Sequence, residues 1–158
     1  MAIISESVDV DVTIGEAFRR WQRLEDFAGQ LRGVHVALQL DDKHSYWIVS
    51  FAGRRKEWFA CIVDEQPDKH IAWRSEEGTP NAGYVRFQAV RPDATRVTVK
   101  FEFEPDGVWE RLGIRLGFVQ RWLRRSLHDF KRLVETRDIA TSEPYPSGWI
   151  TAERAKFT

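Results

Sequence analysis

The sequence has one cysteine, no net charge and no long apolar run, and each absence excludes a class of protein. Cys61 alone cannot form an internal disulfide framework, which suits a reducing compartment. Lysine plus arginine and aspartate plus glutamate both number 24, so no global basic field attracts nucleic acid. No segment approaches the ~20 apolar residues that span a bilayer, and the N-terminus lacks the basic region of a signal peptide. We expect a cytoplasmic protein with no nucleic-acid partner and no transmembrane segment.

Motifs for cofactors, metals and nucleophilic catalysis are also missing. The sequence contains no Gly-x-Ser-x-Gly, no P-loop and no dinucleotide fingerprint. The four histidines lie at positions 35, 44, 70 and 128, a spacing that does not resemble a metal site. His35 and His44 would approach each other across a hairpin, but both fall on predicted polar faces. We therefore predict no metal and no cofactor.

Aromatic residues are what the sequence has in unusual number. Seven Trp, ten Phe and three Tyr make up 13% of the 158 residues, a length that suits one domain. Two interpretations stay open. The rings form a well-packed core, or they line a cavity, since small-molecule sites are mostly apolar with a few placed polar groups.

Alternating apolar residues predict seven strands, over about 3–12, 34–40, 47–51, 54–65, 71–75, 83–89 and 97–103. A capping box, Thr13 followed by Glu16, predicts a helix over 14–23. A second short helix is expected near 24–31. The hairpin-length connections predict an antiparallel sheet.

A helical period begins after Pro105-Asp106. Its apolar stripe recurs at steps of three and four residues and comprises Val108, Leu112, Leu116, Val119, Leu123, Leu127, Phe130 and Val134. The predicted fold is α+β: a seven-stranded, curved antiparallel sheet grips a long C-terminal helix, with two short helices between the first two strands. The domain covers 1–137, and 138–158 forms an irregular tail.

Gly113 and Gly117 lie one turn apart in the predicted helix. Each costs ~1 kcal/mol of helix stability relative to Ala, so a reason for them is expected. Close approach to the sheet is one explanation, and a kink beside a cavity mouth is another.

Glu6 is the candidate catalytic residue. It is in phase with Ile4 and Val8, so it should point inward, where a carboxylate is costly unless it is paired. One interpretation is a general base of raised pKa inside a cavity. The others are a salt bridge, for example to an inward arginine, and exposure where the strand begins.

Trp47, Trp58 and Trp73 are expected to share the concave face of the sheet, where they can stack on a flat ligand. The strand over 54–65 is apolar on both faces, so its inward parity is not fixed. Ser75 lies near a strand end, where a bond to a ligand and a role in a turn both stay open. The predicted ligand-cavity set comprises Trp47, Trp58, Trp73, Ser75, Val85, Phe87, Phe101, Leu112, Leu116, Val119 and Leu123.

Four stretches of the chain carry a likeness to a known family. They are Glu6 to Val8, Trp21 to Val34, Glu57 through Pro67-Asp68 to Ser75, and Asn81 to Val97. The terminal helix with Gly113 and Gly117, then Phe130-Lys131, also fits. Over residues 3–137 the sequence resembles the polyketide cyclase/dehydrase branch of the START-like (SRPBCC, helix-grip) superfamily.

That resemblance implies a deep cavity between helix and sheet, which takes hydrophobic molecules such as polyketide intermediates, quinones, sterols or other lipids. It also implies that no metal and no organic cofactor is needed. The predicted function is binding of a hydrophobic or aromatic small molecule in that cavity. The alternative is a polyketide cyclase/dehydrase that uses acid–base groups of the cavity. A homodimer stays open.

Overall fold

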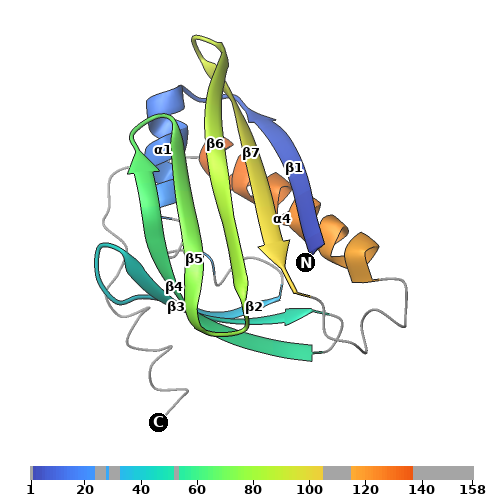
Figure 1. Cartoon of the computed structure of the whole chain (residues 1–158). Coiled ribbons are helices and arrows are strands. Elements are labelled where there is room, and N and C mark those ends of the chain that lie inside the picture. The colour runs from blue at the N-terminus through green and yellow to red at the C-terminus, as the bar shows by residue number, and fades with distance from the viewer. Residues whose placement is uncertain (1, 24–27, 29–32, 52–53, 105–114, 137–158) are drawn as a thin grey trace.

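Seven strands form one antiparallel sheet in the order β1-β7-β6-β5-β4-β3-β2, as Figure 1 shows. This computed structural model describes residues 2–23, 28, 33–51, 54–104 and 115–136. The strands are β1 (Ala2–Val10), β2 (Val34–Gln39), β3 (His44–Phe51), β4 (Arg54–Gln66), β5 (His70–Gly78), β6 (Asn81–Arg91) and β7 (Ala94–Phe103). The helices are α1 (Ile14–Gln22) and α4 (Arg115–Glu135). The predicted helix-grip architecture is confirmed. The tail predicted over 138–158 lies outside the described residues.

The sheet is strongly curved, so that β2 and β3 run across the direction of β1 and β7 (Figure 1). The ladder between β4 and β5 shifts register twice, between Phe59 and Ala60 and between Ile62 and Asp64. An extra residue in one strand of a pair bends that strand and increases its local twist. These two irregularities lie in the middle of the sheet, where its direction changes.

Helix α4 lies across one face of this curved sheet because its apolar stripe is continuous. Val119, Leu123, Leu127, Phe130 and Val134 recur at the spacing of one helix face, and all are buried. They pack in one cluster with residues of β1, β6 and β7 and with α1. The part of the stripe predicted before residue 115 lies outside the described residues.

The start of α1 follows the predicted cap. Thr13 is extended, and its hydroxyl accepts a hydrogen bond from the Glu16 N–H at 3.2 Å. The Glu16 carboxylate pairs with Arg19 at 3.1 Å, so the structure records only the Thr13 half of the predicted capping box. The second short helix, predicted over 24–31, falls almost entirely outside the described residues.

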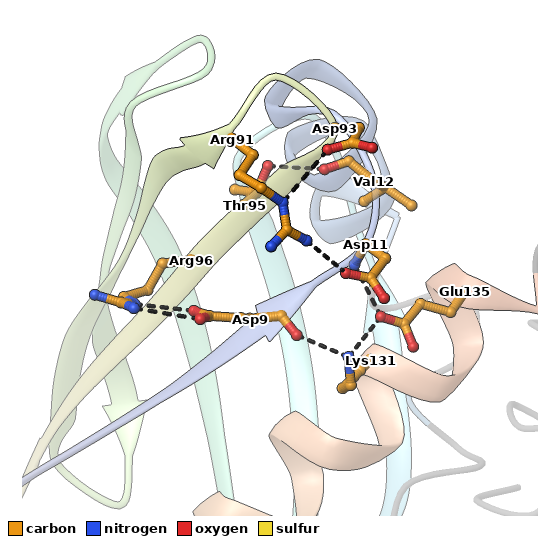
Figure 2. A network of polar contacts seen from close by, with 9 residues as sticks. All are labelled: Asp9, Asp11, Val12, Arg91, Asp93, Thr95, Arg96, Lys131 and Glu135. Atoms are coloured by element: carbon orange, nitrogen blue, oxygen red, sulfur yellow. Dashed lines mark hydrogen bonds and ion pairs between the residues drawn. The ribbon is translucent and has the colours of Figure 1, made fainter.

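Polar contacts attach the end of α4 to β1 and its neighbours (Figure 2). Lys131 Nζ donates to the Asp9 carbonyl at 2.8 Å and to the Glu135 carboxylate at 2.6 Å. That carboxylate also accepts the Asp11 N–H at 2.8 Å. On the other side of β1, Arg96 of β7 forms two bonds to the Asp9 carboxylate, at 2.9 and 3.2 Å. Backbone and side-chain groups of β1 therefore hold both a helix and a strand.

Gly117 does not mediate close approach of α4 to the sheet. A Cβ built on this residue would meet no atom within 4 Å, and the residue is exposed. That explanation of Gly117 is therefore wrong, because the residue is on the solvent side of the helix. Gly113 lies outside the described residues.

Candidate functional site

A cavity of about 530 Å³ lies between the curved sheet and α4. Its described walls come from α1, α4 and every strand except β1 and β6. This volume falls within the ordinary range of small-molecule sites, roughly 300–1,000 Å³. The described lining residues are Trp21, Gln22, Val34, Gln39, Asp42, Ser45, Trp47, Val49, Trp58, Ala60, Cys61, Ile62, Glu65, Ile71, Trp73, Val99, Phe101, Trp122, Leu123, Ser126, Leu127 and Phe130.

Tryptophan dominates the cavity wall. Five of the seven tryptophans of the chain line it, one each from α1, β3, β4, β5 and α4. Trp47 and Trp58 are opposite each other in the β3–β4 ladder and stack, with ring centroids 6.3 Å apart and planes 10° apart. In β4, Trp58 and Ala60 are buried, and Phe59 between these two residues is exposed. The inward face of this part of β4, which the sequence left open, is therefore the face of Trp58 and Ala60. Large flat surfaces of this kind favour a ligand with flat, apolar faces.

A second aromatic wall comes from β5 and β7. Trp73 lies 6.4 Å from Phe101, measured between ring centroids. Trp73 is directly opposite Gly83 of β6 in the ladder, and a Cβ on Gly83 would come within 2.7 Å of the Trp73 ring. The absence of a side chain at Gly83 therefore leaves space for the indole.

Few polar groups border the cavity, and several are already paired. The Trp47 indole N–H donates to Ser45 Oγ at 2.8 Å. Gln22 Nε2 donates to the exposed Glu65 carboxylate at 2.8 Å, which joins the end of α1 to β4. Burial and then Glu76 raise the pKa of the Cys61 thiol, against the smaller effects of Arg74 and Lys43, so this group is neutral near pH 7. The described wall is therefore apolar with polar groups at a few positions.

The profile of the family described as "polyketide cyclase / dehydrase and lipid transport" matches residues 10–132. The chain belongs to this family. The match includes α1, residues 115–132 of α4 and every described lining residue of the cavity, and it confirms the resemblance drawn from the sequence. One fold hosts many functions, so membership does not by itself assign a ligand.

Related proteins agree with this placement. The chain is 34% identical over 150 residues, which cover 94% of it, to an uncharacterised 17.2 kDa protein of Streptomyces lincolnensis, of which 97% is covered. The Zhui aromatase/cyclase of a Streptomyces species has a similar structure, with a TM-score of 0.70 at 16% identity over 90% of this chain and 99% of that one. A START superfamily protein of Mycobacterium smegmatis has a TM-score of 0.67 at 15% identity, over 85% and 97%. At these identities the two structures establish the fold alone.

Residues of the predicted cavity set occupy three kinds of position in this member of the family. Those on the cavity wall are Trp47, Trp58, Trp73, Phe101 and Leu123. Val85, Phe87 and Val119 are buried in the core cluster and are not among the described lining residues. Ser75 Oγ accepts the Asn81 N–H at 3.0 Å across the β5–β6 turn, the structural role that the sequence left open. Leu112 and the side chain of Leu116 lie outside the described residues.

Two tryptophans of the cavity wall, Trp21 and Trp122, were missing from the predicted set. Trp21 belongs to the apolar stripe of α1, and its ring packs on Phe130 with centroids 5.1 Å apart. Trp122 lies three residues after Val119 and four before Ser126, so it flanks the main stripe of α4 and faces the cavity with Ser126. Helical spacing was the available signal for both, but only the curvature of the sheet determines which flank faces the cavity.

Glu6 lies outside the described cavity wall and is paired with α4. Its carboxylate accepts hydrogen bonds from Gln120 Nε2 at 2.8 Å and from Arg124 at 2.9 Å. Burial raises the pKa of Glu6, but the bonds from Gln120 and Arg124 outweigh it, so the net pKa lies below the ordinary value of 4.5. A general base of raised pKa, one interpretation of this residue, does not match that direction. The salt bridge, the alternative interpretation, matches the geometry.

No helix among the described residues is both long and apolar enough to cross a membrane.

Proposed function

We propose that this protein binds a hydrophobic, flat-faced small molecule in the cavity between the sheet and α4. The observation that carries the proposal is the convergence of five tryptophans on a cavity of about 530 Å³. The stacked pair Trp47 and Trp58 forms one wall, and Trp73 with Phe101 forms another. A ligand with aromatic or quinone rings gains apolar contact and ring stacking on both walls.

The composition of the wall favours binding over catalysis. The described lining residues include no histidine, lysine, arginine or tyrosine, the usual donors and acceptors of protons in acid–base catalysis. Their carboxyl groups belong to Asp42 and Glu65, both exposed. An apolar container needs only a few polar groups to orient a ligand, and Ser45, Ser126 and the two glutamines supply them.

The alternative is a cyclase or dehydratase that acts on a polyketide-like substrate. The observation in its favour is that Asp42 and Glu65 border the cavity, where a carboxylate can accept a proton from a bound poly-ketone. Turnover of a poly-ketone surrogate, abolished by Glu65→Gln while binding persists, would favour this alternative. Unchanged turnover in that variant would remove Glu65 from the mechanism.

Native mass spectrometry of gently purified protein, with solvent extraction of whatever it carries, tests the proposal. We expect a mass above that of the bare chain, and an apolar ring compound or lipid in the extract. Bare protein alone, together with no shift in melting temperature from any of a panel of quinones, sterols and fatty acids, would contradict it.

A further inference from the structure

Three residues with metal-binding side chains meet on neighbouring strands. His44 begins β3, Cys61 lies in β4 and Glu76 lies near the end of β5. One nitrogen of His44, the Cys61 sulfur and one Glu76 carboxylate oxygen all lie within 4.8 Å of one another. His44 Nε2 and Glu76 Oε1 are already 3.8 Å apart. The group is half-exposed, so an ion has access from solvent.

The backbone holds this cluster together. His44 and Cys61 are direct partners in the β3–β4 ladder, so their side chains lie on one face of that hairpin. In the β4–β5 ladder, Phe59 pairs with Glu77 and Ala60 with Ser75, so Glu76 is the extra residue of a bulge. Bulges re-aim side chains, and this one brings the Glu76 carboxylate towards Cys61.

Asp41 orients the imidazole of His44. Its carboxylate contacts His44 Nδ1 at 2.8 and 2.9 Å, which leaves Nε2 for Glu76 and Cys61. The same carboxylate accepts the backbone N–H groups of Lys43 and His44, at 2.8 and 2.9 Å, so it is itself fixed. Histidines that bind metals almost always bond a carboxylate or carbonyl through their other nitrogen in this way.

We propose that His44, Cys61 and Glu76 bind a divalent transition-metal ion of the zinc type, with Asp41 as the group that orients His44. A thiolate together with an imidazole suits Zn²⁺ and disfavours Mg²⁺ and Ca²⁺, which prefer oxygen ligands. Three protein ligands leave a fourth tetrahedral position for water or an external ligand. Cys61 is paired with Arg74 of β5. The charges of the ion and of Arg74 together balance those of the Cys61 thiolate and of the Glu76 and Asp41 carboxylates.

The required adjustment is small. Bonds of about 2.0–2.3 Å in a tetrahedron put neighbouring ligand atoms roughly 3.5 Å apart. The His44–Glu76 distance of 3.8 Å is close to that value, and the widest separation in the cluster, within 4.8 Å, closes by about 1 Å through side-chain torsions. His44 and Glu76 are not among the described lining residues of the cavity, and only Cys61 is. Binding of the ion therefore does not require a ligand in the cavity.

Titration of the full-length, metal-free protein with Co²⁺, followed by optical absorption and by competition with Zn²⁺, tests the proposal. We expect one ion per chain and a thiolate-to-cobalt charge-transfer band that Zn²⁺ abolishes. Cys61→Ser should eliminate the band. His44→Gln and Glu76→Gln should weaken binding, and Asp41→Asn should weaken it by about 10–100-fold, as outer-shell partners do.

Two variants serve as matched controls. His70 also pairs with a carboxylate, Asp64 at 2.6 Å, but belongs to no cluster of three ligands among the described residues. Glu77 is the exposed neighbour of Glu76. His70→Gln and Glu77→Gln should leave the affinity unchanged. A band that survives Cys61→Ser, or equal losses in the controls, would overturn the site.

A measurement on the unmodified protein covers the case in which a variant fails to fold. Zn²⁺ binds the native state through three groups that are far apart in the unfolded chain, so it should raise the melting temperature in a concentration-dependent manner. Mg²⁺ at the same concentration should not. No shift with Zn²⁺ and no cobalt band in the wild-type protein would refute the proposal, whatever the cavity binds.

Discussion

Gly83 shows how a single residue shapes the cavity wall. It is paired with Trp73 on one side and Phe101 on the other. A Cβ at this position would lie 2.4 Å from the Lys100 carbonyl oxygen and 2.7 Å from the Trp73 ring. Neither a backbone carbonyl nor an indole held between strands can easily give way. Glycine is therefore required for the Trp73 ring to lie where it borders the cavity.

We expect Gly83→Ala to lower the free energy of unfolding by about 1–3 kcal/mol, the usual cost of overpacking. Because Trp73 must move, its fluorescence should change in the native state as well. Denaturant unfolding with a tryptophan emission spectrum measures both effects.

Gly117→Ala is the matched control for this substitution. The added methyl group meets no atom within 4 Å, so the variant should keep its native emission spectrum and gain up to about 1 kcal/mol from helix propensity. Equal destabilisation by the two substitutions would mean that the contact with Trp73 does not explain the requirement for glycine.

The alternation of side chains along a strand correctly predicted the direction of some single residues. The period of two placed Glu6 inward with Ile4 and Val8, and its side chain does turn towards α4. Its partners Gln120 and Arg124 follow more than 110 residues later, so no local pattern identifies them. The cluster of His44, Cys61 and Glu76 was missed for the same reason, since it depends on strand register and on a bulge.

At the scale of elements, α4 is attached to β1 by charge as well as by apolar contact. Lys131 and the Asp11 N–H both bond the Glu135 carboxylate (Figure 2). Burial raises the pKa of Glu135, but these two bonds outweigh it, so the net pKa lies below the ordinary value of 4.5. The ionised carboxylate therefore favours the folded state. Its contribution is present above pH 4.5 and is lost as the pH falls through the folded pKa.

We expect Glu135→Gln to lower the free energy of unfolding by about 1 kcal/mol at pH 7, a value that allows for partial exposure of the pair. The difference in free energy of unfolding between the wild type and the variant, the gap, should shrink as the pH falls below 4.5, because the Glu135 carboxylate of the wild type then loses its charge. Unfolding titrations at several pH values measure it, with Glu77→Gln as an exposed control. A gap that is independent of pH would contradict the role assigned to the Glu135 charge.

The elements themselves were largely predictable. Alternation and helical period identify all seven strands, α1 and α4, because each element buries one face. Strand β5 was expected to cover 71–75 and extends over His70–Gly78. Its outer half is exposed and polar, so apolar alternation stops there although the ladder with β4 continues. The bulges between β4 and β5 leave no such pattern in the sequence.

At the scale of the whole molecule, the position of a residue along its element decides whether it faces core or cavity. Phe87 shares a face of the sheet with the cavity residues, but it packs against Phe18 of α1 with centroids 5.3 Å apart. Trp73 instead packs beside Phe101 and borders the open space of the cavity. Period alone assigns both to one face, so the predicted set combined cavity with core. Curvature of the sheet and the placement of α1 separate them.

Ala60 offers the most direct test of the cavity as a binding site. It is buried on the wall beside Trp58, so Ala60→Phe places a ring in the space meant for a ligand. The matched control is Ala89→Phe, an exposed position on β6. The stability of both variants is checked first by thermal unfolding, since a larger core residue also introduces strain.

The decisive measurement is quenching of tryptophan fluorescence by a naphthoquinone probe in these three proteins. The five wall tryptophans predict saturable quenching in the wild type and in Ala89→Phe. In Ala60→Phe the affinity should fall by about tenfold or more, equivalent to about 1.4 kcal/mol. Identical curves for all three folded proteins, or no saturable quenching in the wild type, would contradict the assignment of this cavity as the binding site.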